Sequence, residues 1–162
     1  MKKLTIIAGL LLGSASIFAQ SPSLKFSLRG SLAIPTGDWS LLQNTGGVLE
    51  LQANKSLSDR FSLYGSLGYG GFAGAKDIGV SGSSILPILA GFNFDSNVFH
   101  AGLGFGYTSI MVGGGSSVGG FTFRPEVGFN LSKKVQLNLN YTSANTPDFY
   151  MNYIGITPTF KF

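Results

Sequence analysis

The sequence predicts an all-β fold in which eight antiparallel strands, in up-and-down order, close into a barrel. Apolar and polar residues alternate in eight runs of about ten residues, which is the period of a strand with two unlike faces. Short and long connections alternate between these runs. Hydrophobic residues make up 44% of the 162-residue chain and charged residues only 11%, whereas a soluble domain carries roughly a quarter of its residues as charge. Beyond the N-terminus, no apolar run is long enough to cross a membrane as a helix.

The N-terminal segment has the pattern of a secretory signal peptide. Lys2 and Lys3 form a positive start, 4–12 is a short apolar stretch, and Ala19 ends a run of small residues that suits cleavage. We therefore expect residues 1–19 to be a signal peptide and residues 20–162 to form the barrel domain. Removing the two lysines from the 11 basic residues leaves nine against seven acidic ones. That balance gives no indication of a nucleic-acid partner.

The first four predicted strands have one apolar and one polar face. In the first, Phe26 and Leu28 alternate with Ser27 and Arg29, and the later ones repeat this pattern with leucine, isoleucine and phenylalanine against serine, asparagine and glycine. Such strict alternation is expected of a strand buried on one side only. These strands cover residues 24–34, 49–54, 61–70 and 86–94.

The last four predicted strands follow the same rule. The seventh is the clearest, because Val135, Leu137 and Leu139 alternate with Gln136 and Asn138. A proline cannot donate a hydrogen bond to a neighbouring strand, so each proline inside a run predicts a local irregularity. The four strands cover residues 99–107, 121–129, 135–142 and 154–162, and the prolines within strands are Pro87, Pro125 and Pro158.

The connections between the strands come in two lengths. Tight turns are predicted at 55–60, 95–97 and 131–134. The other four links are longer and cover residues 35–46, 72–84, 108–120 and 143–149. Short turns at one end and long loops at the other are typical of a transmembrane barrel with both termini in the periplasm.

The aromatic residues of the apolar face are sorted by height along the barrel. One band lies near the short turns and the other near the long loops, with aliphatic residues between them. Two such girdles indicate a barrel in lipid. The alternative is a soluble barrel with its apolar face inside, but the polar face has too few charges for a soluble surface. We therefore predict a transmembrane β-barrel whose girdle includes Phe26, Phe61, Phe94, Phe99, Phe129, Tyr69, Tyr107 and Tyr141.

The last predicted strand carries a resemblance to a known family. It ends in Phe160 and Phe162, with Ile156 on the same face. With this strand, the whole of 20–162 resembles the small eight-stranded outer-membrane β-barrels, the OmpA/OmpX-like group of the outer membrane protein β-barrel domain. The resemblance implies that Ile156, Phe160 and Phe162 form an assembly signal for the barrel-assembly machinery, reached with the help of periplasmic chaperones. It also implies contact with outer-membrane lipid and lipopolysaccharide.

Four charged residues fall at similar mid-depth on the predicted lumen face. They are Arg29, Glu50, Arg124 and Glu126. Because buried charges are costly unless they are paired, we predict an Arg29–Glu50 contact and one interior network that includes Arg124 and Glu126. This network either fixes the barrel interior or acts as a gate in a narrow pore.

The single histidine, His100, is placed on the lumen face near the 95–97 turn. Catalysis there would need a nucleophile or a carboxylate partner in reach. Lipid-modifying barrels of similar architecture use histidine with serine at the other end, and here His100 is followed by Ala101 and Gly102. One histidine and no cysteine also argue against a transition-metal site.

These observations predict an integral outer-membrane protein with a structural or surface-interaction role, without catalysis, metal or cofactor. A narrow porin or small-solute channel is the alternative, and an outer-membrane lipid-modifying enzyme is a second. Trp39, Leu41 and Leu42 in the first long loop are expected to anchor the rim in lipid or to contact lipopolysaccharide or a partner. The three hypotheses differ in what the lumen does, so its structure is the discriminating observation.

Overall fold

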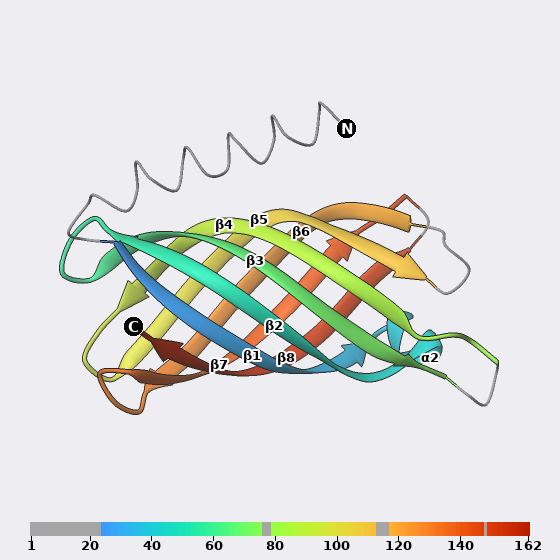
Figure 1. The fold of residues 1–162 in the computed structure, drawn as a ribbon, viewed down its shortest axis with the longest axis horizontal. Helices are drawn as coiled ribbons and strands as arrows, with labels where there is room; N and C mark the ends of the chain where they lie inside the picture. The colour runs from blue at the N-terminus through green and yellow to red at the C-terminus, as the bar shows by residue number, and fades with distance from the viewer. Residues whose placement is uncertain (1–23, 76–78, 113–116, 148) are drawn as a thin grey trace.

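Eight antiparallel strands close into a barrel in the computed structural model of the chain. The model describes residues 24–75, 79–112, 117–147 and 149–162, so the predicted signal peptide and parts of three predicted loops lie outside the described residues. Each strand pairs with the next in the chain, and β8 pairs with β1 (Figure 1). The predicted up-and-down antiparallel barrel is therefore confirmed.

The short turns and the described chain ends lie at one end of the barrel, and a four-residue helix, α2 (Trp39–Leu42), lies at the other (Figure 1). The barrel is closed by β1 (Leu24–Thr36), β2 (Gln43–Ser56), β3 (Phe61–Gly74), β4 (Ser83–Asp95), β5 (Phe99–Val112), β6 (Ser117–Asn130), β7 (Val135–Asn145) and β8 (Tyr150–Lys161).

The strands run further toward the long-loop end than the sequence pattern predicted. β5 continues to Val112 and β6 begins at Ser117, although 108–120 was expected to be a loop. The predicted loops 35–46, 72–84 and 143–149 are shortened in the same way. A tilted strand needs about 9–11 residues to cross the hydrocarbon, and most of these strands have 12 to 14. The longest strands therefore extend past the apolar layer.

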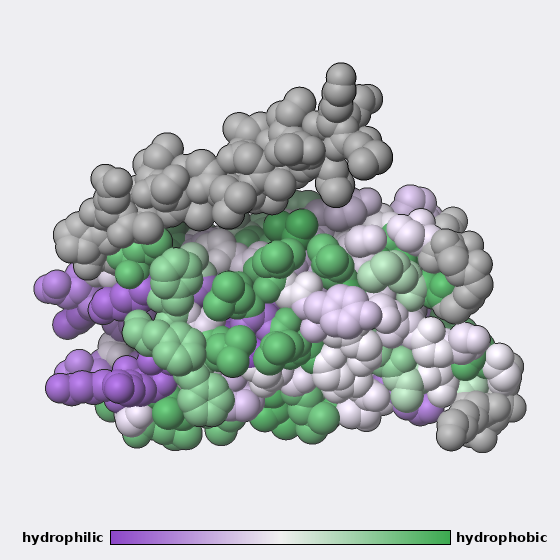
Figure 2. All heavy atoms as spheres, in the orientation of Figure 1, coloured by the Kyte–Doolittle hydropathy of each residue, from purple (hydrophilic) through white to green (hydrophobic). Residues whose placement is uncertain are grey.

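The outward face is an apolar belt. Leucine, isoleucine and phenylalanine alternate outward along every strand, as with Leu49, Leu51 and Leu67, each more than half exposed. Figure 2 shows hydrophobic side chains gathered in a green band beside the hydrophilic short-turn end. No helix in the described part of the chain is long and apolar enough to span a membrane. Apolar surface of this extent, arranged as a belt, fits contact with lipid.

The faces change polarity at the long-loop end. Above the belt several interior positions are apolar, among them Ala33, Val48, Ile85 and Ile110, all buried. Buried polar residues such as Gln43, Ser83 and Thr108 lie beside them. This apolar part of the lumen was not predicted, because the sequence pattern predicts that the polar face of each strand lies inside the barrel. It is the pattern of a barrel segment in water, where apolar side chains gather inside. The apolar core of the molecule is therefore at one end and inside the barrel.

The three prolines predicted to mark irregularities, Pro87, Pro125 and Pro158, lie inside strands, and each coincides with a break in pairing on one side. Pro35 also lies within a strand, near the end of β1. The β3–β4 register has no Cα partners between Leu67↔Ile88 and Gly70↔Ile85, next to Pro87. On the other side of β4 the register runs without a gap through Pro87↔Thr108. Similar gaps adjoin Pro125 in the β6–β7 pair and Pro158 in the β1–β8 pair. The missing donor thus interrupts the ladder locally without shifting the register.

Candidate functional site

The barrel interior has three levels along its axis. An open cavity lies at the short-turn end, charged residues meet at mid-depth, and the apolar cluster fills the long-loop end. Alternation along the strands aims every second side chain inward, so each level draws on several strands.

Arg29 crosses the lumen from β1. Its guanidinium makes a bidentate contact with Glu126 of β6, in which Nη1 donates to Oε1 at 3.1 Å and Nη2 donates to Oε2. Nη1 also donates to Gln52 Oε1 at 2.8 Å. Glu50, which the strand register places directly opposite Arg29, is 3.6 Å from Nε. The predicted Arg29–Glu50 contact is thus present, but the main partner of Arg29 is across the barrel.

Arg124 makes the reciprocal contact in the other direction. Its Nη1 and Nη2 donate to Glu50 Oε2 at 2.5 Å and Oε1 at 3.0 Å. Both arginines and both glutamates are buried. The structure therefore brings together all four residues that the sequence placed at mid-depth, as two crossed arginine–glutamate pairs that span the lumen.

This arrangement, which we call the charge network, cancels two positive charges with two negative ones. Bidentate arginine–carboxylate pairs fix both distance and plane. Removing one member of a buried pair leaves an uncompensated charge and costs about 3–5 kcal/mol. The charge network thus holds β1, β2 and β6 in one geometry and occupies the middle of the lumen.

His100 extends the charge network toward the short-turn end. Its Nε2 lies 3.0 Å from Glu126 Oε1, and its Nδ1 lies 3.0 Å from Asp95 Oδ1. Asp95 Oδ1 also accepts from Gln136 Nε2 at 3.3 Å and from Lys161 Nζ at 3.4 Å. A chain of polar contacts therefore runs from mid-depth to the cavity, with both ring nitrogens of His100 beside carboxylates.

Sequence reasoning missed Asp95 and the carboxylate partners of His100. Asp95 and His100 are Cα partners across the β4–β5 turn, so their side chains leave the sheet on the same side. A tight turn at 95–97 predicts this pairing, so the sequence could have placed Asp95 beside His100. The Glu126 contact needs the β5–β6 register as well, where Gly102 opposes Glu126.

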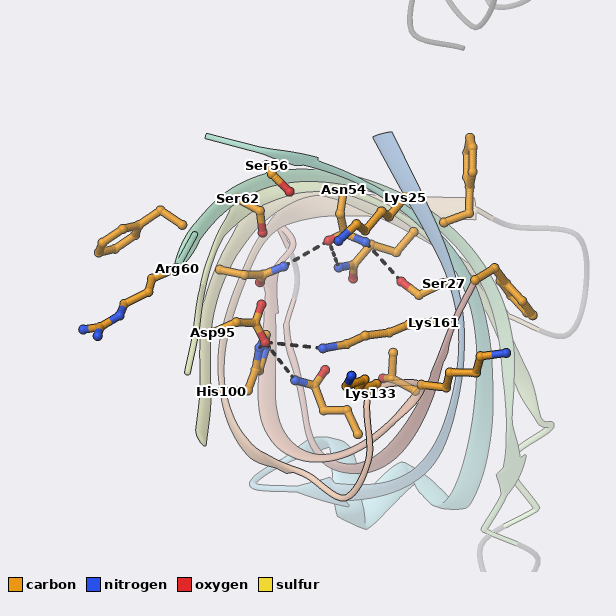
Figure 3. Close-up of a pocket in the computed structure, with 18 of the residues that line it drawn as sticks. Lys25, Ser27, Asn54, Ser56, Arg60, Ser62, Asp95, His100, Lys133 and Lys161 are labelled. Atoms are coloured by element: carbon orange, nitrogen blue, oxygen red, sulfur yellow. Dashed lines mark hydrogen bonds and ion pairs between the residues drawn. The ribbon is translucent and has the colours of Figure 1, made fainter. Parts of the chain in front are cut away.

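The cavity at the short-turn end has a volume of about 450 Å³. Its floor includes His100 and Gln136, and its walls include Ser27, Asn54 and Thr159. Figure 3 shows Lys25 and Lys161 reaching into it, while Arg60 points away. The cavity is thus polar, and it ends where the charge network begins.

The apolar cluster closes the long-loop end. Trp39 of α2 stacks on Phe149 with ring centroids 5.4 Å apart and meets Phe72 edge-on at 6.0 Å. Tyr153 and Met151 pack in the same cluster. The predicted rim-anchor role of Trp39 is wrong, because α2 turns this side chain inward, where it is only 2% exposed. Leu41 and Leu42 of the same helix stay exposed.

The predicted girdle residues point away from the lumen. At the short-turn end, Phe61 and Phe94 are opposite each other on β3 and β4 with ring centroids 5.2 Å apart, and Phe99 and Phe129 pair similarly at 6.4 Å. Edge-to-face aromatic pairs of this kind stabilise a protein beyond the contribution of the surface that they bury. The exposed members of both girdles are Phe26, Phe61, Phe99, Phe129, Tyr69, Tyr107 and Tyr141.

The predicted assembly residues lie on the outward face of the last strand. Ile156 and Phe160 are exposed on β8, opposite Leu32 and Leu28 of β1, and Phe162 follows the strand. Their role in assembly is a prediction that the fold does not test. Among the described residues, no group of three or more histidine, aspartate or glutamate side chains is arranged to hold a metal ion.

The comparisons with known proteins agree with this architecture. Residues 5–162 match the family described as outer membrane protein beta-barrel domain. The chain therefore belongs to this family and is an integral β-barrel of the outer membrane. A comparison with curated proteins gave no match.

Solved structures similar to this chain are small outer-membrane barrels. Ail, the attachment invasion locus protein of Yersinia pestis, has 11% identity and a TM-score of 0.62, with 86% of this chain and 97% of Ail covered. The N-terminal β-barrel domain of Pseudomonas aeruginosa OprF has 10% identity and a TM-score of 0.63, with 85% and 97% covered. OprG from the same organism has 10% identity and a TM-score of 0.55, with 85% and 95% covered. At such identities the likeness establishes the fold alone.

Proposed function

We propose that this protein is a non-conducting outer-membrane barrel with a structural or surface-interaction role. One observation carries the proposal: described side chains fill the lumen at two separate levels. The charge network crosses it at mid-depth with buried arginine–glutamate pairs. The apolar cluster around Trp39 fills it at the long-loop end. A permeating ion would have to displace paired, desolvated charges and then an apolar plug.

We propose further that the barrel does not catalyse a reaction. His100 is engaged by Asp95 and Glu126 on its two ring nitrogens. Activation of a nucleophile would need one of these nitrogens within hydrogen-bond reach of a hydroxyl or thiol group. The carboxylate partner that catalysis could use is therefore present, but the described partners of His100 include no nucleophile. This arrangement favours a structural link between the charge network and the cavity wall.

The surface-interaction part of the proposal draws on the similar structures. Ail is described as an attachment invasion locus protein, and this chain has the same closed eight-stranded architecture. The outward end of this barrel carries α2, with Leu41 68% exposed. Leu42 of the same helix is also exposed, so two apolar side chains at this end are free to contact another molecule.

Single-channel recording in planar lipid bilayers tests the proposal. Folded protein, verified by its heat-dependent shift in gel mobility, is inserted beside a porin that serves as the positive control. We expect no stable conductance steps from this barrel at membrane potentials that open the porin. Stable steps in the wild-type protein would contradict the proposal and support the narrow-channel alternative. Replacing Glu126 by glutamine would then change the ion selectivity if the charge network were a gate.

A further inference from the structure

The cavity at the short-turn end has an excess of positive charge. Two acidic residues, Asp59 and Asp95, line it. Five cationic residues line it, namely Lys25, Arg60, Lys133, Lys134 and Lys161. They come from β1, from the β2–β3 and β6–β7 turns and from β8, so the positive charge surrounds the opening of the cavity instead of lying on one side.

The acidic residue at the cavity floor does not neutralise this excess. Asp95 already accepts from His100, Gln136 and Lys161, and Lys161 Nζ also donates to Asn130 Oδ1 at 3.1 Å. Within the described residues, Lys25, Lys133 and Lys134 line the cavity and make neither a side-chain hydrogen bond from the ammonium group nor an ion pair. Three ammonium groups at the cavity are therefore available to an anion.

The donor set indicates which anion fits. Arginine is suited to a planar carboxylate because its guanidinium donates two parallel hydrogen bonds, whereas lysine acts as a point charge and is a common phosphate binder. Arg60 points away from the cavity (Figure 3), and both lumen arginines are used in the charge network. Ammonium groups approach the cavity from separate strands and turns, with the hydroxyls of Ser56 and Ser62 beside them. Such a set suits a tetrahedral anion with several oxygens.

We propose that this cavity, which opens at the periplasmic end, is a binding site for a phosphate group. Two sources share this chemistry. Exposed aromatic side chains of the outward face, Phe26, Phe61 and Phe162, also line the cavity, so a phospholipid headgroup of the adjoining leaflet can reach it with its acyl chains outside the barrel. A soluble phosphate ester reaches it from the periplasm. The proposal is independent of whether the barrel conducts.

Titration of the folded barrel with sn-glycerol 3-phosphate tests the soluble source. The barrel is held in uncharged detergent micelles, and binding is followed by calorimetry and by phosphorus NMR of the probe. The double variant Lys25→Gln/Lys133→Gln removes two of the three ammonium groups without partners and leaves Lys134 in place. A hydrogen bond to a charged group contributes about 1.5–3 kcal/mol, so the variant is expected to bind at least about tenfold more weakly.

The matched control is Lys55→Gln, which is compared with the single variants Lys25→Gln and Lys133→Gln. It removes the same charge from the same end as each single variant, but Lys55 does not line the cavity. We expect the control to bind within about twofold of wild type, since loss of a distant, screened charge has little effect. Equal weakening by Lys55→Gln and by the two single variants would overturn the proposal, because binding would then reflect the net charge of the surface.

Nanodiscs that contain phosphatidylglycerol in a phosphatidylcholine background test the lipid source. The phosphatidylglycerol retained after exchange into detergent is measured for wild type, for Lys25→Gln/Lys133→Gln and for the control Lys55→Gln. Retention by wild type and control but not by Lys25→Gln/Lys133→Gln, without binding of glycerol phosphate, assigns the site to a lipid headgroup and supports the proposal. Absence of both glycerol phosphate binding and lysine-dependent lipid retention would overturn it.

Discussion

At the scale of single residues, the lumen is dominated by side chains that are costly to bury. Arg29, Arg124, Glu50 and Glu126 are buried in the middle of a barrel whose outside is lipid. Such groups are tolerated because each guanidinium meets a carboxylate in a fixed geometry. The contribution of each arginine–glutamate pair to the free energy of unfolding is therefore detected only when one partner is removed.

Replacing Glu50 by glutamine is expected to destabilise the barrel strongly. Arg124 would lose its bidentate carboxylate partner, and an unpaired buried charge costs about 3–5 kcal/mol. The free energy of unfolding is measured by urea titration of the barrel in lipid vesicles. The control Asp59→Asn makes the same change at an exposed turn residue and should stay within about 0.5 kcal/mol of wild type.

The double variant Glu50→Gln/Arg124→Gln distinguishes pairing from simple loss of charge. It removes both members of one pair and leaves Arg29 with Glu126. The double variant should be less destabilised than the sum of its two single variants, because neither charge is left alone. Strict additivity would contradict a direct pair between Glu50 and Arg124.

At the scale of elements, β5 is shaped by glycines on its lumen face. A Cβ added at Gly106 would meet the carbonyl oxygen of Ile88 and lie 2.8 Å from the Cα of Leu89 in β4. Both neighbours are backbone atoms and cannot swing aside. Gly106 thus allows β4 and β5 to approach closely in a narrow barrel.

Gly106→Ala is therefore expected to cost about 1–3 kcal/mol, as overpacking does in other cores. Gly65→Ala is the matched control, because a Cβ at that outward position has nothing within 4 Å. Urea unfolding in the same vesicles measures both variants. A loss of stability at Gly65 as large as that at Gly106 would mean that backbone freedom, not close approach, explains the effect.

The helix α2 is the other element with a specific role, since it carries Trp39 into the barrel. Trp39 is the single tryptophan of the chain, so its fluorescence reports on this position alone. We expect its emission to resist quenching by brominated lipids and by aqueous iodide, because Phe149 and Phe72 enclose it. Strong quenching by brominated lipids would restore the rim-anchor interpretation.

At the scale of the whole molecule, the sequence was sufficient for every feature that the lipid imposes. Lipid requires an apolar residue at every second position and a closed set of strands, so runs such as 135–142 predicted strands, faces and order. The turns at 95–97 and 131–134 were predictable as the short gaps between these runs. At the long-loop end the lipid no longer constrains the sequence, and there the pattern ended the strands too early.

Two features of the lumen needed the three-dimensional arrangement. Arg29 faces Glu50 on the neighbouring strand, yet it bonds mainly to Glu126 across the barrel, which depends on strand tilt and stagger. The inward turn of Trp39 depends on how α2 folds over the end of the barrel. Alternation along one strand carries no information on either contact.

The lumen is closed between the cavity and the apolar cluster, and this central claim is tested most directly by thiol labelling. The chain contains no cysteine, so the labelling of a single-cysteine variant reports on the introduced thiol alone. Ser62 lines the cavity, whereas Thr108 is fully buried on β5, two residues from Ile110 of the apolar cluster. In the folded barrel we expect a charged, membrane-impermeant maleimide to label Ser62→Cys and to leave Thr108→Cys unreacted until unfolding. Labelling of Thr108→Cys in the folded barrel at the rate of Ser62→Cys would contradict the closed lumen.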